Sequence, residues 1–165
     1  MSFEGTEQLL KRTQNFVDDH RGLYLQSGGA QGHIVDLTHA GARGLLPTLL
    51  LKTRGRKSGK TSIVPLIYGV FGDEWVVVGS KGGAPDHPAW FLNLEAQPQA
   101  AFQVATQAFT ASWRLAEGDE RAQVWAYMQH LYPPYADYLA AAGGRTIPLV
   151  MLRPNAPTAV FSADD

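Results

Sequence analysis

The sequence predicts a mainly β protein of the α+β class: a small antiparallel barrel or curled sheet of about six strands, with three to four flanking helices. Two observations predict it. The apolar runs Pro47–Arg54, Thr61–Phe71 and Glu74–Ser80 are joined by short, glycine-containing turns, as hairpins are. Helical stretches do not alternate regularly with these runs, which argues against a doubly wound parallel sheet.

The elements follow in order along one expected domain. They are a helix over Thr6–His20, a glycine-rich loop over Gly22–Gly44, the three strands above, a helix from an Asp86 N-cap to Ala96, strands over Gln99–Thr106 and Ala108–Leu115, a helix from Glu117 to Tyr132, a helix over Tyr135–Ala142 and a last strand over Thr146–Arg153. Pro65 indicates a bulge or an edge position in the second strand. We expect residues 1–44 to pack on the barrel, residues 45–153 to form it, and residues 154–165 to be a mobile tail.

The composition excludes several classes of function. The net charge of −1 over 165 residues provides no global field that attracts nucleic acid. The absence of cysteine excludes disulfides, cysteine-ligated metals and cysteine nucleophiles, and the histidines show no metal-ligand spacing, so we expect no metal site. Acids near the N-terminus and the lack of a long apolar run predict no signal peptide and no integral membrane segment, hence a cytoplasmic protein. The alternative role of the first helix is peripheral contact with a membrane or a partner.

A cationic turn, Lys52–Lys60, joins the first two predicted strands. It contains five of the 14 Lys and Arg residues and no acid. It is not a Walker A loop, because only three residues separate Gly55 from Gly59 and a strand follows where a helix is required. Its glycines expose N–H groups, and its guanidinium and ammonium groups suit phosphate or carboxylate. The turn therefore predicts an anion site; the alternative is a charged, solvated hairpin tip.

Two further segments suit a ligand. Ser80–Gly83 places a hydroxyl, a cation and two glycines at a strand end, where a backbone can approach a flat molecule; the alternative is a plain connection. Tyr132, Tyr135 and Tyr138 are expected to line an aromatic pocket or, alternatively, to form a core-facing stripe. No nucleophile–base pair is recognisable, so an enzyme of this sequence would take its reactive atom from a cofactor.

Several blocks together resemble the deazaflavin-dependent nitroreductase family over roughly residues 45–153. The blocks are Leu50–Gly59, Val64–Leu66, Ser80–Leu94, Gln97–Pro98, Tyr132–Tyr138 and Arg145–Pro148. The resemblance implies a split β-barrel like that of flavin reductases. It also implies binding of coenzyme F420, an 8-hydroxy-5-deazaflavin whose tail carries a phosphate and oligoglutamate. The implied activity is hydride transfer from the reduced deazaflavin to a small electron acceptor such as a quinone, a nitroaromatic or an activated alkene.

The resemblance also implies roles for individual residues. Those that would hold the phosphate and tail are Lys52, Arg54, Arg56, Lys57, Ser58 and Lys60. Those that would line the deazaflavin are Val64, Pro65, Ser80, Lys81, Gly82 and Ala84, with Trp90 and Asn93 closing that end. Those that would face the substrate are Tyr68, Tyr132, Tyr135 and Tyr138. Ser80 or a tyrosine hydroxyl would polarise the acceptor and help to protonate it.

Three other functions stay open at this point. The protein would be a reductase of the same fold that binds FMN or FAD, or a non-catalytic carrier of a deazaflavin, a flavin or a lipid. It would otherwise be an anion- or nucleic-acid-binding hairpin domain, against which the net charge of −1 argues. The oligomeric state, monomer or homodimer, is also open.

Overall fold

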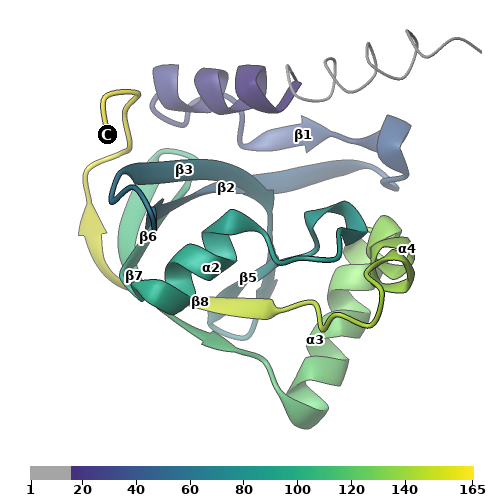
Figure 1. Ribbon diagram of the computed structural model, residues 1–165. Coiled ribbons are helices and arrows are strands. Elements are labelled where there is room, and N and C mark those ends of the chain that lie inside the picture. The colour runs from purple at the N-terminus through teal and green to yellow at the C-terminus, as the bar shows by residue number, and fades with distance from the viewer. Residues whose placement is uncertain (1–15) are drawn as a thin grey trace, which may run out of the picture.

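The computed structural model describes residues 16–165, and its centre is one eight-stranded sheet (Figure 1). The strands are β1 Ile34–Asp36, β2 Leu45–Arg54, β3 Thr61–Ile67, β4 Gly69–Phe71, β5 Glu74–Val78, β6 Ala100–Val104, β7 Gln107–Leu115 and β8 Leu149–Thr158. Their order is β1-β2-β6-β7-β8-β5-β4, with β3 pairing to β2 beside this path. All pairings in the described chain are antiparallel. The predicted α+β class is confirmed, but the predicted six strands are wrong.

The two additional strands come from segments that the sequence pattern assigned differently. β1 lies within the predicted loop Gly22–Gly44; it is only three residues long, and Val35 is its one buried side chain. The predicted strand Thr61–Phe71 divides at Tyr68 into β3 and β4. The division arises because β3 pairs with β2 whereas β4 pairs with β5, so the chain changes partners there.

β8 starts and ends later than the predicted strand Thr146–Arg153. Beyond Leu152 it pairs with β7 alone, so Pro154 and Pro157 lie on a strand with a free edge, where proline is tolerated. Phe161, further on, is only 2% exposed. The segment from residue 154 that we expected to be a mobile tail is therefore a strand followed by a packed aromatic side chain.

The helices cover both sides of the sheet. An N-terminal helix occupies residues 16–26, and α2 Ala89–Ala96, α3 Gly118–Leu131 and α4 Pro134–Ala141 follow, with short 3-10 turns η1 Thr38–Ala40 and η2 Lys81–Gly83. Of the predicted helix Thr6–His20, residues 6–15 lie outside the described residues. The predicted N-cap Asp86 is wrong: α2 begins after Pro88, and the Asp86 carboxylate instead accepts the Lys81 ammonium at 3.1 Å.

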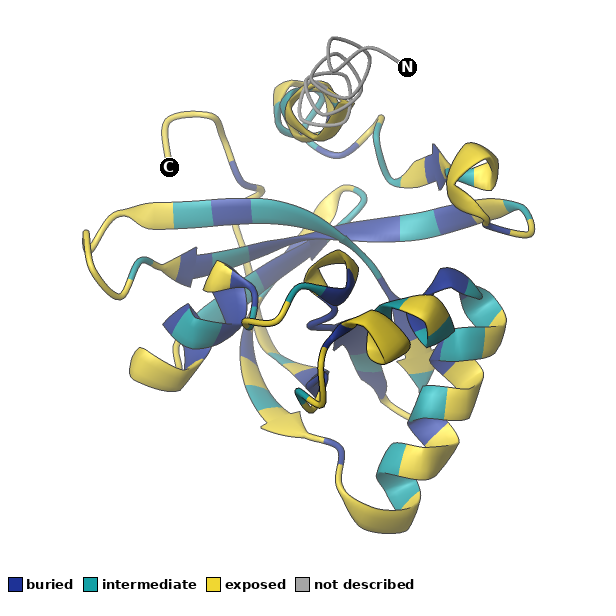
Figure 2. Ribbon diagram, turned by 45° about the vertical axis from the view of Figure 1, so that its right-hand side comes forward, coloured by how far each residue is buried: buried dark blue, intermediate teal, exposed yellow. Residues whose placement is uncertain are grey.

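Buried side chains form three clusters along the strands, which appear as dark blue stretches in Figure 2. One joins β5 and β8 to α3 and α4, the second packs α2 on β2 and its neighbours, and the third lies under the N-terminal helix. Tyr24 belongs to the third. Its buried hydroxyl donates to the Thr48 carbonyl and accepts the Ala105 N–H, each at 2.9 Å, and burial raises the pKa of Tyr24 to about 12. The N-terminal helix is thereby fixed to β2 and β6.

Candidate active site

A cavity of about 790 Å³ lies between the N-terminal helix, β3, the segment after β5, and α4. Eight of the predicted site residues line it: Pro65, Ser80, Lys81, Gly82, Trp90, Tyr132, Tyr135 and Tyr138. They come from four separate parts of the chain, and the structure brings them to one place. The volume lies within the range of small-molecule binding sites.

The outer edge of β3 forms one wall through Pro65, Leu66 and Ile67. β3 pairs only with β2, which confirms the edge position predicted from Pro65. Hydrogen bonds from Tyr68 N to Pro47 O and from Gly55 N to Lys60 O lie at the two ends of the β2–β3 ladder, so the even-numbered residues 60 and 68 face β2. Since antiparallel pairs alternate, the odd-numbered residues of β3 direct their backbone groups away from β2. The wall therefore offers backbone hydrogen-bonding groups to a flat ligand.

The segment Gly79–Ala84 forms the second wall and has an unusual backbone. Lys81, Gly82 and Gly83 have φ values of 47°, 62° and 84°. A Cβ at Gly83 would lie 2.8 Å from the Tyr138 carbonyl oxygen, and one at Gly79 would lie 2.5 Å from Pro148 Cγ. Both glycines therefore allow the segment to lie directly against residues 138–148. The Ser80 hydroxyl makes no hydrogen bond to another described residue, and Ser80 is 8% exposed at the cavity.

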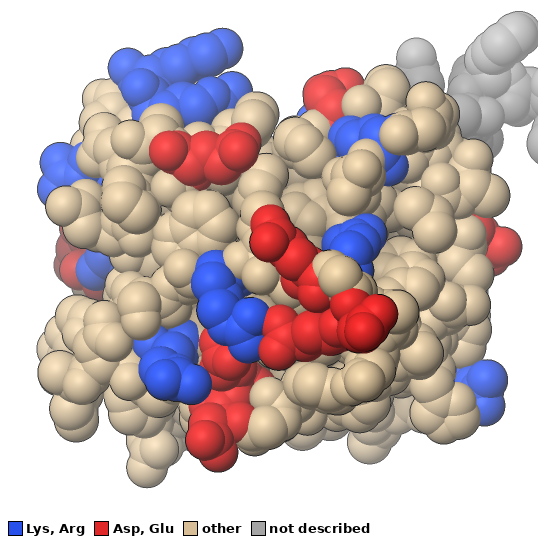
Figure 3. All heavy atoms as spheres, turned by 90° about the horizontal axis from the view of Figure 1, so that it is seen from below, with Lys and Arg blue, Asp and Glu red and all other residues tan. Residues whose placement is uncertain are grey.

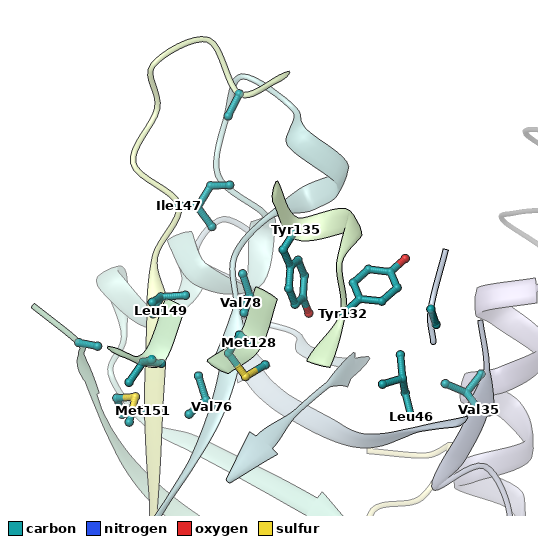
Figure 4. Close-up of a cluster of buried hydrophobic side chains, with 14 residues drawn as sticks. Val35, Leu46, Val76, Val78, Met128, Tyr132, Tyr135, Ile147, Leu149 and Met151 are labelled. Atoms are coloured by element: carbon teal, nitrogen blue, oxygen red, sulfur yellow. The ribbon is translucent and has the colours of Figure 1, made fainter. Parts of the chain in front are cut away.

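Three tyrosines form the opposite wall. Figure 4 shows the rings of Tyr132 and Tyr135 next to each other, and their centroids are 5.0 Å apart at an angle of 78°. The hydroxyls of Tyr132 and Tyr138 are hydrogen-bonded at 3.3 Å. Burial raises the pKa values of Tyr132 and Tyr135 well above the ordinary range, so both hydroxyls keep their protons. This wall can thus donate hydrogen bonds to a carbonyl or nitro oxygen.

The cationic turn is held next to α2. The side-chain oxygen of Asn93 accepts the backbone N–H of Arg56 at 3.1 Å and its guanidinium at 3.3 Å. The Asn93 amide donates to the Thr53 hydroxyl at 3.1 Å. Within the turn, the Ser58 hydroxyl accepts the Lys60 N–H at 3.1 Å. Ser58 and Asn93 therefore shape the turn, and no described carboxylate forms a salt bridge with its cations Arg54, Arg56, Lys57 and Lys60.

The turn and the cavity lie along the same two elements. On α2, Trp90 lines the cavity and Asn93 holds the turn; residues three apart share a helix face, about 4.5 Å apart along the axis. On β3, Pro65 lines the cavity and Thr61 begins the strand next to the turn, about 13 Å away at 3.3 Å per residue. An extended ligand can therefore reach both.

Ten of the 18 predicted site residues do not line the cavity. Six of them form or hold the cationic turn: Arg54, Arg56, Lys57, Ser58, Lys60 and Asn93. The other four lie elsewhere. Lys52 pairs with the Asp165 carboxylate at 3.6 Å and lies over the Phe161 ring, on the face of β2 opposite Thr53 and α2, because adjacent strand residues point to opposite faces. Tyr68 points into the core, where its hydroxyl bonds to His33 at 2.8 Å. Val64 packs in the cluster under α2, and Ala84 contributes a carbonyl to Arg145 rather than a contact with the cavity.

The structure adds residues that the sequence pattern did not indicate. Phe16, Val17 and His20 of the N-terminal helix line the cavity, as do residues of β1 and η1, including His39. His20 Nε2 lies 2.7 Å from the Gly32 carbonyl, which only accepts, so this nitrogen is the donor. The helix spacing predicted packing on the sheet, but no local signal indicated that the packed helix borders a cavity.

Three further findings concern nucleic acid, metal ions and membranes. Seen from below in Figure 3, Asp and Glu lie among Lys and Arg, so this face presents no broad basic surface for nucleic acid. Residues 16–165 contain no cluster of three His, Asp or Glu side chains that could hold a metal ion. No helix in this range is long and apolar enough to cross a membrane.

The antiparallel sheet with an edge strand bordering a cavity is shared with a solved F420-H2 dependent reductase of the split-barrel fold. Residues 26–154 match the model of the F420H(2)-dependent quinone reductase family. The chain belongs to this family.

Individual proteins agree with this assignment. An F420H(2)-dependent quinone reductase of Mycobacterium tuberculosis is 31% identical over 136 residues, which are 81% of this chain and 86% of that protein. A solved F420-H2 dependent reductase has a TM-score of 0.59 and 36% identity over 65% of this chain and 94% of its own. A second solved structure, described as a domain-swapped dimer, has a TM-score of 0.61 and 30% identity over 90% of this chain and 99% of its own.

Proposed function

We propose that this protein transfers a hydride from reduced coenzyme F420 to a quinone or a similarly electron-poor acceptor. The observation that carries the proposal is a cavity bordered by β3 and α2, with four cations that have no described carboxylate partner at the turn beside the same two elements. A deazaflavin with a phosphate and oligoglutamate tail needs both. A neutral ligand without an anionic tail would need only the cavity.

The residues present suit this cofactor. The edge of β3 and the segment Ser80–Gly82 would enclose the ring, because both border the cavity and the edge of β3 directs backbone groups away from β2. Trp90 would close the end nearest the turn. Arg54, Arg56, Lys57 and Lys60 would hold the phosphate and the glutamate carboxylates by charge-assisted hydrogen bonds. Lys52 is not included, since Asp165 and Phe161 already occupy its ammonium group.

The tyrosine wall would bind the acceptor. When bound, reduced F420 supplies the hydride; the quinone also takes up one proton and becomes a hydroquinone. The Tyr132 hydroxyl keeps its proton, and the hydrogen-bonded hydroxyls of Tyr132 and Tyr138 would donate to the quinone oxygen on which negative charge develops. Phe16 and Val17 would cover the acceptor and exclude water. Ser80 would donate a further hydrogen bond from the opposite wall.

A location in the cytoplasm is part of this proposal. Both a monomer and a homodimer are compatible with a cavity built from one chain. The related structure described as a domain-swapped dimer favours the homodimer.

The tyrosine hydroxyls provide the test of this function. Replacing Tyr132 and Tyr138 together by Phe keeps both rings and removes both donors. With reduced F420 and a quinone, kcat is expected to fall by roughly tenfold to a hundredfold, because the developing oxyanion loses its hydrogen bonds. Affinity for F420, measured by fluorescence titration, is expected to stay close to that of the unchanged protein. The assay follows oxidation of the cofactor by absorbance.

Tyr127→Phe is the matched control, since this tyrosine is exposed on α3 and does not line the cavity. It should leave kcat unchanged. A double variant that reduces the quinone as fast as the unchanged protein would show that the tyrosine wall takes no part in the reaction.

A further inference from the structure

Arg145 binds the segment Gly79–Ala84, which forms the second wall of the cavity, without lining the cavity itself. The guanidinium of Arg145 donates to three backbone carbonyls: Gly79 at 3.0 Å, Ser80 at 2.8 Å and Ala84 at 3.0 Å. It also lies 3.0 Å from His87 Nδ1, which must accept, because a guanidinium only donates. Arg145 itself does not line the cavity. Its fork therefore spans both ends of the segment that carries Ser80, Lys81 and Gly82.

The same segment touches the tyrosine wall. Gly83 lies against the backbone of Tyr138 so closely that a Cβ there would be 3.0 Å from Tyr138 Cα, and the Gly79 N–H donates to the Pro148 carbonyl at 2.9 Å. Arg145 lies between these two contacts in the sequence. Residues 138–148 thus hold the segment Gly79–Ala84, which is the second wall of the cavity. Through Tyr138 they also provide part of the tyrosine wall.

A guanidinium is required for this arrangement. Its planar fork reaches several acceptors at once, whereas a lysine ammonium is a point charge on a flexible stem. Arg145 forms no salt bridge with a described carboxylate, so its charge remains next to Ser80.

We propose that Arg145 is the positioning residue of the active site, which fixes the Ser80–Gly82 segment at the correct distance from the tyrosine wall. The inference rests on the proposed function, because the distance between the two walls matters only if a cofactor and an acceptor lie between them. Without Arg145, the carbonyls of Gly79, Ser80 and Ala84 lose a hydrogen-bond donor. The segment between them contains three consecutive positive φ values and would then lack these side-chain hydrogen bonds.

The test compares Arg145→Ala and Arg145→Lys with Arg153→Ala, which removes an exposed side chain that makes no hydrogen bond to another described residue. Hydrogen exchange of the amides in residues 80–87 is measured on the cofactor-free protein, and F420 affinity by fluorescence titration. Arg145→Ala is expected to accelerate the exchange and to weaken F420 binding about tenfold, since preorganisation is lost. Arg145→Lys should behave like Arg145→Ala. Added guanidinium ion, at a concentration that does not denature, should restore part of the affinity of Arg145→Ala only.

Unchanged exchange and unchanged affinity in a folded Arg145→Ala protein would overturn the inference. Where Arg145→Ala does not fold, Arg145→Lys decides: full affinity in that variant would show that any cation suffices. If the unchanged protein does not bind F420 at all, the proposed function fails, whereas the exchange measurement still tests the hold of Arg145 on the segment.

Discussion

Replacing Arg56 and Lys57 together by Ala is expected to weaken F420 binding by roughly 1–3 kcal/mol for each cation removed, because charge-assisted hydrogen bonds to the tail are lost. Arg56 and Lys57 have no described carboxylate partner, so both charges are available to the anionic tail, together with those of Arg54 and Lys60. The fold should be preserved, since the backbone N–H of Arg56, which the substitution keeps, also bonds to Asn93. Fluorescence titration of oxidised F420 measures the change.

Two controls separate the tail from the ring. A deazaflavin that lacks the phosphate and glutamates should bind the double variant and the unchanged protein equally. Arg153→Ala removes an exposed cation elsewhere and should have no effect. Rising salt should weaken binding of the intact cofactor to the unchanged protein more than to the double variant. If the ring fragment loses as much affinity as F420 does, the turn acts on something other than the tail.

Gly83→Ala is expected to destabilise the protein by roughly 2–4 kcal/mol, through a strained left-handed backbone and an overpacked contact. The new Cβ would lie 2.8 Å from the Tyr138 carbonyl oxygen and 2.9 Å from Ala141 Cβ, at φ +84°. A backbone oxygen cannot turn aside as the end of a side chain can, so η2 and α4 must separate. Unfolding in urea measures the loss, and F420 affinity should fall with it.

Gly72→Ala is the matched control for backbone strain alone. Gly72 has φ +62° in the β4–β5 turn, and a Cβ there would meet nothing within 4 Å. Its expected loss is about 1 kcal/mol. Equal losses in the two variants would mean that the close approach of Gly83 to α4 contributes nothing to stability.

The hairpins were predictable because their signals are local. The turns at residues 55–60 and 72–73 contain the glycines that such connections need, and Pro65 correctly indicated an edge strand. β1 was missed because three residues with one buried side chain give no periodicity. The end of β8 was missed because Pro154 and Pro157 argue against a strand, and only the pairing partners show that its outer edge is free.

The sequence indicated which segments form the site, but not which residues of these segments contact one another. The resemblance brought Ser80 and the tyrosines together, and the structure places them around one cavity. A count of charges does not show that Lys52 lies on the opposite face of β2 from Thr53, beside Asp165. Arg145 bonds to carbonyls more than 60 positions away, so no local pattern shows its partners.

The central claim is that one groove binds the ring of F420 in the cavity and its anionic tail at the turn. Parallel titrations of the protein with F420 and with FMN, at low salt, test it most directly. F420 should bind at micromolar concentration or better and FMN much more weakly, and reduced F420 should then be oxidised when a quinone is added. Equal or tighter binding of FMN, or no binding of F420, would contradict the claim.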